Sequence, residues 1–458
     1  MVVVVVVDVA VLVDLLVLVL VSASGDGDGD GDEPLGGCGE ADPPYFKASG
    51  HPGCRAGVAK CPKATLPRTP RVSRTLPSRE RYHRPEMPTA PVTRRALTRR
   101  AFTRTATTGL LALSLPSLTR CATMRDMTAS FTAQPASALT AVLEGETSLR
   151  YTNAQARPEL PAHLRAGSAV RRWGGRLVVV QDDVHALGFL DERSGDITAL
   201  LLPPGADGSY VFGDDLGNKA LKMDLEACIT LPDGRLVALG SGSTPARERV
   251  VIVDPSGDVR LFNAHGLYAA LHARPDFTGS ELNIEGATVV GDALLLFQRG
   301  NGAPRDGLLP VNAVGRMDLA AVVRFLDGGE APVLLEVTQV DLGQARSVRF
   351  GFTDACTLPD GRVAFLAGAE DSPDTYRDGQ VVGCRFGILD GAAGTYTDVL
   401  AADGSASLLK LEGLDFVAEH ADGTLEFVVV ADMDSPQVPA LRASLRVRGA
   451  GQREGGER

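Results

Sequence analysis

The segments 225–235 (LEACITLPDGR) and 352–362 (FTDACTLPDGR) decide the fold of this chain. Both end in Leu-Pro-Asp-Gly-Arg, and each is followed by a second apolar stretch, at 236–239 and at 363–366. An Asp-Gly pair between two apolar stretches is a strong signal for a β-hairpin, because glycine accepts the positive φ that such a turn requires. The two segments therefore predict two copies of one hairpin.

Weaker copies of this hairpin lie before, between and after the two clear ones. The residues that open the copies, at 168, 226, 285, 353 and 412, are spaced by 58, 59, 68 and 59 residues. Such regularity indicates a repeat architecture, and four short strands per unit describe a propeller blade. We predict an all-β fold over 145–449, a β-propeller of five blades, or of six if the long third unit contains another. The fifth unit has three clear strands, and the segment 148–152 (SLRYT) is expected to supply the fourth and close the ring.

The first 127 residues differ in composition from the repeats. Residues 1–91 are interpreted as low-complexity, disordered sequence that lies upstream of the true start codon. Within 92–127, Arg99 and Arg100, followed by Phe102 and the apolar stretch 106–118, resemble a twin-arginine export signal. We therefore expect a periplasmic or secreted protein, with a membrane anchor at Cys121 or a cytoplasmic location as alternatives. Residues 450–458 are expected to be a disordered tail.

The charge of the repeat region restricts its partners. Residues 128–458 carry 29 Lys and Arg against 45 Asp and Glu. Because phosphate contacts dominate the affinity for nucleic acid, this excess of acid argues against nucleic acid and suits a cationic partner. The cysteines of this region, Cys228, Cys356 and Cys384, lie far apart and form neither a disulfide framework nor a zinc motif. We expect them to be buried as small apolar side chains.

In a propeller the first strand of each blade lines the central channel, so the residues that open the copies should converge on the axis. The predicted channel acids are Asp224, Glu226, Glu285 and Glu412, while Thr353 takes the aligned place in the fourth unit and Asp354 is offset by one. Like charges brought together need a cation or basic neighbours, and Lys222 and Lys410 precede two of the acids. Two hypotheses follow: a site of oxygen ligands for a divalent cation, Ca²⁺ or Mg²⁺, or a ring of ion pairs that joins the blades.

A second polar group follows the second strand of each unit. Its members are Asp182, Asp183, Ser241, Ser243, Arg299, Asn301, Glu370, Asp371, Asp432 and Asp434. Polar residues are common where strands end in solvent, but 370–374 (EDSPD) and 432–434 (DMD) are unusually acidic. Since Arg299 belongs to the same group, a site for an anionic ligand bridged by a metal is a further hypothesis.

No signature of a catalytic site stands out in the chain. The segment 240–244 (GSGST) is not a nucleophile elbow, because Gly242 occupies the place of the serine. The histidines of the repeat region are scattered without an HExxH motif, and there is no P-loop. These patterns leave open whether the protein is an enzyme.

Three short motifs resemble those of an uncharacterised bacterial β-propeller family. They are 222–227 (KMDLEA), 283–287 (NIEGA) and 410–414 (KLEGL). That family is distantly similar to esterase-like phytases. The resemblance implies a calcium-dependent phosphomonoesterase or another esterase, with Glu226, Glu285 and Glu412 as metal ligands. The lysines beside the acids, and Thr353 at one aligned position, depart from a clean metal cage.

The sequence thus predicts an exported propeller that binds a ligand or partner at one rim, with an acidic channel for which a divalent-cation site and a ring of ion pairs stay the two alternatives. The alternative function is that of a calcium-dependent phytase-like phosphoesterase. The expected partner is a small molecule or a protein. We also expect a monomer, with no integral membrane span in the mature protein.

Overall fold

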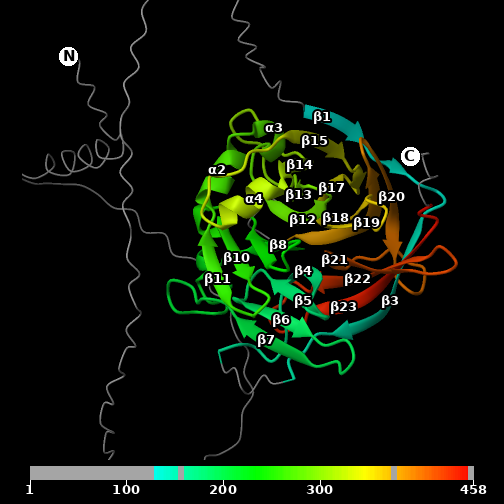
Figure 1. Ribbon diagram of the computed structural model, residues 1–458. Coiled ribbons are helices and arrows are strands. Elements are labelled where there is room, and N and C mark those ends of the chain that lie inside the picture. The colour runs from blue at the N-terminus through cyan, green and yellow to red at the C-terminus, as the bar shows by residue number, and fades with distance from the viewer. Residues whose placement is uncertain (1–127, 153–158, 373–378, 452–458) are drawn as a thin grey trace, which may run out of the picture. The chain divides into compact units, whose positions relative to one another are not determined.

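The computed structural model describes residues 128–152, 159–372 and 379–451 (Figure 1). The predictions for 1–91 and 92–127, and for the tail from residue 452 onward, lie outside the described residues. Strands dominate the described part, as predicted for an all-β fold, and they form several mainly antiparallel sheets. None of the helices in these residues is long and apolar enough to cross a membrane.

Most strands fall into five groups of four hydrogen-bonded neighbours. In chain order the first two groups are β4 (Gly167–Trp173), β5 (Arg176–Gln181), β6 (Ala186–Leu190) and β7 (Ile197–Leu201), then β8 (Leu225–Thr230), β9 (Leu236–Gly240), β10 (Arg249–Val253) and β11 (Val259–Asn263). The next two groups are β12 (Ile284–Val290), β13 (Ala293–Gln298), β14 (Ala313–Asp318) and β15 (Glu336–Asp341), then β17 (Val348–Thr357), β18 (Val363–Asp371), β19 (Gln380–Asp390) and β20 (Ala393–Leu400).

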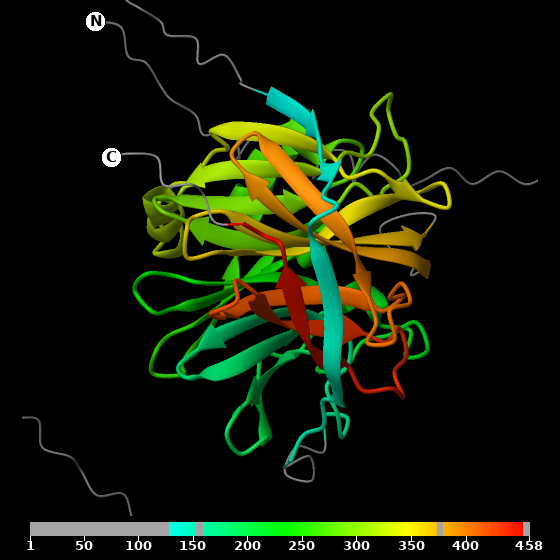
Figure 2. The ribbon, with the colours of Figure 1, turned by 90° about the vertical axis from the view of Figure 1, so that its right-hand side faces the viewer.

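The fifth group combines both ends of the described chain. It consists of β21 (Lys410–Glu419), β22 (Leu425–Asp432), β23 (Leu441–Arg448) and the early strand β3 (Thr140–Ser148), which lies beside β23 and meets β20 (Figure 2). An early strand therefore completes this group, as expected, but it ends at Ser148, where the predicted segment 148–152 begins. Leu149 and Tyr151 of that segment are buried too, but residues 149–151 pair with 162–164 instead.

Two short strands precede β3 and extend neighbouring sheets. β1 (Thr128–Thr132) pairs in parallel with β15, and β2 (Gln134–Pro135) pairs in parallel with β20. Another short strand, β16 (Gln344–Ala345), pairs with β17. The sheets thus begin at residue 128, ahead of the predicted limit of 145.

The first strands of the five groups form a closed ring. β4 contacts β8, β8 contacts β12, β12 contacts β17, β17 contacts β21, and β21 contacts β4 (Figure 1). The later strands of each group lie progressively farther from the common centre. This arrangement is propeller-like, with each sheet presenting its first strand to the axis.

A β-bulge lies in every inner strand, at the residue that opens each copy of the repeat. The pairing register skips one residue at each of Ser168, Glu226, Glu285, Thr353 and Glu412. A bulge leaves the extra residue unpaired and re-aims its side chain. The regular spacing in the sequence therefore corresponds to a β-bulge that recurs in all five groups.

The helices are short and lie in connections. α2 (His265–His272) and α3 (Pro275–Thr278) follow β11, while α4 (Leu319–Leu326) follows β14 and is capped by Asp318, which accepts from the backbone nitrogen of Ala321 at 2.6 Å. Two 3-10 helices, η2 (Lys219–Leu221) and η3 (Pro245–Arg247), precede β8 and β10. α4 and the loop between β13 and β14 account for the length of the third unit.

Apolar side chains fill the space between neighbouring sheets. Phe352 of β17 lies edge-on to Phe297 and to Phe365, with ring centroids 5.2 and 5.3 Å apart. Near the axis the backbones themselves approach. A Cβ atom on Gly413 of β21 would lie 2.8 Å from the nitrogen of Val170 in β4, so only glycine fits this contact.

We expect Gly413→Ala to lower the free energy of unfolding by about 1–3 kcal/mol, because the added methyl group forces two inner strands apart. Gly368→Ala is the matched control, since its Cβ would meet only the Thr353 side chain at an ordinary 3.4 Å. Urea denaturation of both variants measures the difference. Equal stability of the two variants would show that the inner strands are not closely packed here.

Candidate functional site: the acidic rim

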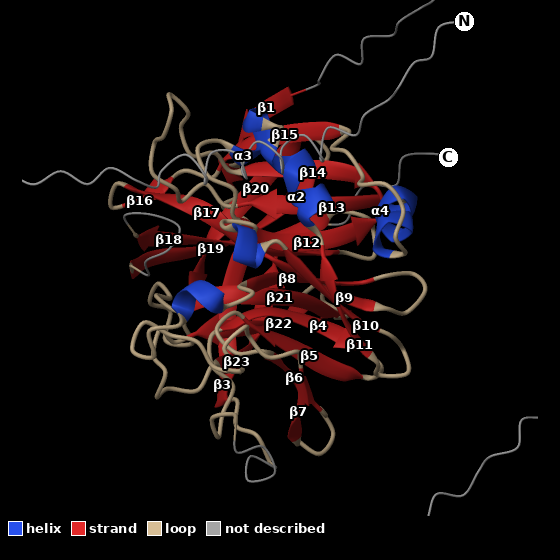
Figure 3. Ribbon diagram, turned by 90° about the vertical axis from the view of Figure 1, so that its left-hand side faces the viewer, coloured by secondary structure: helices blue, strands red, loops and turns tan. Residues whose placement is uncertain are grey.

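The inner strands begin, and the second strands end, at one end of the ring, which we call the acidic rim. Leu225 at the start of β8 pairs with Gly240 at the end of β9, and Lys410 at the start of β21 pairs with Asp432 at the end of β22. The two polar groups predicted from the sequence therefore meet at the same rim. α4 lies at the opposite end of the ring (Figure 3).

An ion pair between Arg171 of β4 and Asp354 of β17 spans the axis. Each terminal nitrogen of Arg171 donates to one oxygen of Asp354 at 2.9 Å, and Asp354 also accepts from the backbone nitrogens of Ala355 and Leu414. Arg171 donates further to the carbonyl oxygens of Val170, Ala287, Ala355 and Leu414. These bonds join four of the five inner strands.

Sequence reasoning placed Asp354 in the channel but missed Arg171. The signal was available, because Arg171 follows the opening residue of its copy by three positions, where the other units carry Ile229, Thr288, Cys356 or Asp415. Of the two arginines in this strand, Arg171 follows directly on apolar residues and is buried, while Arg172 is exposed. The cysteines nearby are as predicted: Cys228, Cys356 and Cys384 are buried and form no disulfide.

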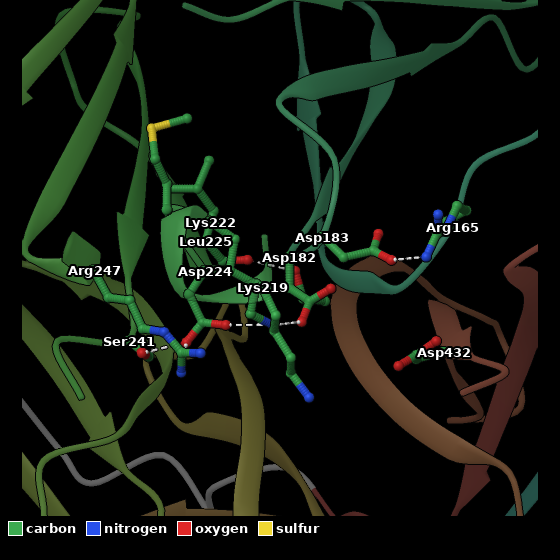
Figure 4. Close-up of polar contacts among 12 residues, drawn as sticks. Arg165, Asp182, Asp183, Lys219, Lys222, Asp224, Leu225, Ser241, Arg247 and Asp432 are labelled. Carbon is green, nitrogen blue, oxygen red and sulfur yellow. Dashed lines mark hydrogen bonds and ion pairs between the residues drawn. The ribbon is translucent and has the colours of Figure 1, made fainter. Parts of the chain in front are cut away.

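The first cluster of charges centres on Lys222 (Figure 4). Its ammonium lies 2.5 Å from an oxygen of Asp182 and 2.6 Å from an oxygen of Asp224. Although burial opposes the charge, Asp182 and Asp224 raise the pKa of Lys222 well above its usual value. Lys222 is therefore charged, and it compensates Asp224 as predicted.

Asp224 has further partners on its other side. Arg247 lies 2.7 Å away, and the hydroxyl of Ser241 donates to the same carboxylate oxygen at 2.5 Å (Figure 4). Ser243 accepts from Arg247 and lies 2.9 Å from the Ser241 hydroxyl. The two serines of the Gly-Ser-Gly-Ser segment thus form hydrogen bonds with Asp224 and with its partner Arg247.

The second cluster centres on Arg299, at the end of β13. It pairs with Glu285 at 3.3 Å and with Glu370 at 2.6 Å. Asn283 donates to Glu285 at 2.6 Å and to Asn301 at 3.2 Å. The channel acid of the third unit is thereby tied to polar residues from two sheets.

The third cluster centres on Lys410, at the start of β21. Its ammonium lies 2.8 Å from Asp434, 3.3 Å from Asp432 and 3.5 Å from Glu412. Burial opposes the charge of Lys410, but these carboxylates raise its pKa well above the usual value. The predicted compensation of Glu412 by Lys410 is present.

Two bulge positions carry hydroxyls that bridge neighbouring inner strands. Ser168 of β4 donates to the carbonyl oxygen of Leu225 at 2.6 Å, and Thr353 of β17 donates to that of Leu411 at 2.7 Å. The other three bulge positions carry glutamates. Asp371, also predicted for this rim, is exposed at the end of β18.

Glu226 differs from the other buried acids. Only 9% of the residue is exposed, and among the described residues no ion pair or hydrogen bond to its carboxyl group is found, although its charge helps to raise the pKa of Lys222. One of its oxygens lies within 4.8 Å of oxygens of both Asp182 and Asp224. Burial, and then the charges of Asp224, Asp182, Glu285 and Glu412, raise its pKa well above the usual value.

The acidic rim contains more acid than base. In and around the three clusters, nine carboxyl groups lie with five basic side chains. The acids are Asp182, Asp183, Asp224, Glu226, Glu285, Glu370, Glu412, Asp432 and Asp434. The bases are Arg165, Lys222, Arg247, Arg299 and Lys410. Burial is the main cause that raises the pKa of Asp183 to about 8 and that of Asp434 to about 7. The electrostatics of the rim therefore favour the binding of additional positive charge, as a proton, a metal ion or a cationic ligand.

A ring of sheets with charged residues at one rim defines a propeller-like protein. The chain belongs to a family of unknown function (DUF6929), whose model matches residues 163–447. The resemblance of the Leu-Glu-Gly-type motifs to an uncharacterised family agrees with this match, while the relation to esterase-like phytases stays a prediction. No curated protein matches the chain.

Several solved structures are weakly similar. A mannose phosphorylase from Leishmania mexicana is 13% identical with a TM-score of 0.35, covering 66% of this chain and 88% of its own. A gluconolactonase from Xanthomonas campestris is 13% identical at 0.32, covering 68% and 97%. Regucalcin from Agrobacterium tumefaciens, described as a calcium-binding protein, is 13% identical at 0.31, covering 70% and 97%.

Replacing Arg171 with methionine should lower the free energy of unfolding by about 3–5 kcal/mol, because Asp354 then stays buried without its partner. The double variant Arg171→Met/Asp354→Leu should recover much of this loss, since no uncompensated charge remains. Urea denaturation followed by the fluorescence of Trp173, the only tryptophan, measures both. A single variant as stable as the wild type would contradict a central role for the pair.

The raised pKa of Glu226 predicts a pH dependence of stability. Above the ordinary pKa of 4.5, the folded protein keeps a proton on Glu226 that the unfolded chain releases, so stability should fall as pH rises from that value. Glu226→Gln mimics the protonated form and should melt about 2–4 °C above the wild type at pH 8, with a smaller difference near pH 5. Thermal denaturation in chelator tests this, with the exposed Glu336→Gln as control; parallel pH profiles would contradict it.

Proposed function

We propose that this protein is a five-bladed β-propeller that binds ligands at its acidic rim, with a divalent-cation site formed by Asp182, Asp224 and Glu226. The five groups of four strands and the closed ring of inner strands support the blade count. The observation that carries the site is Glu226. A buried carboxylate without a partner is costly unless a positive charge neutralises it, and two more carboxylates lie within reach of the same ion.

Calcium is the ion that best suits these ligands. It takes six to eight oxygen ligands and tolerates irregular geometry, so three carboxylates and solvent can complete its coordination. Lys222 already pairs with two of the three carboxylates and competes with the ion. We therefore expect weak binding, with a Kd of about 10⁻⁴–10⁻³ M, as in extracellular calcium modules.

We also propose that the protein is exported as a monomer to the periplasm or the medium. Arg99 and Arg100 ahead of the apolar stretch 106–118 support this location. A weak calcium site suits such a compartment, since weak sites are typical of extracellular modules.

A calcium-dependent phosphoesterase is the second candidate function. Arg299 and Lys410 stand beside the acids at the same rim, where bases could hold a phosphate next to a metal ion. Each of these bases, however, already pairs with two or three carboxylates. The binding function is therefore the one we favour.

Calcium at about ten times its Kd should stabilise the wild type by about 1.4 kcal/mol and raise the melting temperature by about 3 °C. Glu226→Gln should lose most of this gain, because the amide keeps the shape of the ligand but not its charge. Lys222→Met should enlarge the gain, because it removes the competing ammonium from Asp182 and Asp224. Calorimetry with calcium, magnesium or chelator measures all three proteins.

The absence of any calcium-dependent shift in both the wild type and Lys222→Met would overturn the metal site and leave the ring of ion pairs. Calcium-dependent release of nitrophenol from p-nitrophenyl phosphate, lost in Glu226→Gln, would replace the binding function with the phosphoesterase.

A further inference from the structure

A cavity of about 580 Å³ lies between the third and fourth groups of strands, away from the acidic rim. It is found at the opposite end of the ring, where β12 ends and β13 begins. One wall comes from β1 and from β12, β13, β14 and β15, and the other from β18, β19 and the turns before β18 and after β19. Its size suits a small molecule, since ligand sites in proteins measure about 300–1,000 Å³.

The walls of this cavity are mainly apolar. Six apolar side chains larger than alanine line it, and these are Phe131, Val290, Leu295, Val314, Val363 and Leu389. The first four are only half-buried, so the space that they line together leaves apolar surface in contact with solvent. Covering that surface with an apolar ligand is favourable because of the hydrophobic effect.

Two glycines keep the second wall open. Gly361 lies in the turn between β17 and β18, and Gly391 lies in the turn between β19 and β20, with φ of 84° and 60°. Glycine accepts the positive φ of these turns at no steric cost. A Cβ atom on either residue would meet nothing within 4 Å outside its chain neighbours. The two hairpin turns therefore leave space opposite the apolar face of the third group.

Arg316 on β14 supplies a positive charge to the cavity. The other charged residue in its lining is Glu336 on β15, whose side chain is 61% exposed, against 34% for Arg316. The charge of Arg316 is therefore the less screened of the two. Its ion pairs, at 3.2 Å with Asp292 and 3.9 Å with Glu336, involve exposed carboxylates, and such pairs are weak. A ligand carboxylate can replace them with two parallel hydrogen bonds to the guanidinium.

We infer that this cavity binds a small molecule with an apolar body and one carboxylate, which pairs with Arg316. The apolar body covers the half-buried side chains of the third group, and the carboxylate meets the less exposed of the two charges. An amine would meet the guanidinium instead, and a neutral molecule would make no use of it. This inference goes beyond the proposed function, because the cavity lies away from the acidic rim and involves no metal ion.

Equilibrium dialysis of the protein against radiolabelled decanoate tests the inference. Decanoate joins an unbranched apolar chain to a single carboxylate. We expect saturable binding of one molecule per chain, with a Kd of about 10–100 μM. Decan-1-ol has the same chain without the charge, so it should compete about five- to tenfold less well than unlabelled decanoate.

Two variants separate the apolar and the charged parts of the site. Ala129 is exposed on β1 and lines the cavity, so Ala129→Trp should keep the fold, fill the cavity and weaken decanoate binding about tenfold or more. Arg316→Gln should weaken decanoate binding about fivefold and leave competition by decan-1-ol unchanged. The matched controls are Thr132→Trp, on the same strand but outside the lining, and Arg324→Gln on α4, and both should bind as the wild type does.

The absence of saturable decanoate binding to the wild type would overturn the site. Equal competition by decan-1-ol, or equal decanoate binding by the wild type and Arg316→Gln, would overturn the carboxylate as the recognised group. Decanoate binding that Ala129→Trp leaves intact would show that the ligand binds elsewhere, and would overturn the cavity as its site.

Discussion

The guanidinium of Arg171 holds the centre of this protein together. A ring of sheets has no single core at its axis, so the inner strands need direct contacts with one another across the middle. Arg171 supplies five N–H donors in a fixed plane, and it bonds to Asp354 and to carbonyl oxygens of four inner strands. The glycines beside it allow the backbones to come close enough for these bonds. A buried ion pair of this kind contributes little net stability by itself, but it fixes which strand lies opposite which.

The repeated bulge then decides what the rim can do. All five inner strands carry the same irregularity, which places one side chain per strand where the ladder of hydrogen bonds is interrupted. Two of these positions carry hydroxyls that bridge to the next strand, at Ser168 and Thr353. The other three carry glutamates. Lys222, Arg299 and Lys410 form ion pairs with most of the carboxylates around them. The same repeat position therefore bridges neighbouring inner strands in two groups and carries an acid of the proposed binding site in the other three.

In the function that we propose, the two hypotheses for the channel acids are combined in one site. Glu285 and Glu412 take part in ion pairs with bases of their own clusters, which is the structural role. Glu226 has no such partner, and it lies beside Asp182 and Asp224, which is the arrangement expected of a cation ligand. The excess of carboxyl groups over bases at the rim favours a positively charged ligand.

The sequence by itself determined the strands, the hairpins and the repeat, because alternating apolar residues and Asp-Gly turns act over a few neighbouring positions. It also identified the glutamates of the rim, because they share one repeat position in three of the five copies, and the two lysines that precede acids in two of these copies. It misplaced the strand that completes the fifth group, because 140–148 is selected by its pairing with β23 at the other end of the chain. It missed Arg171 for the same reason: the partner Asp354 is 183 positions away, and only the closed ring brings the two together. The merging of two polar groups into one rim, and the isolation of Glu226 within it, likewise depend on contacts between residues far apart in sequence, which the tertiary structure alone decides.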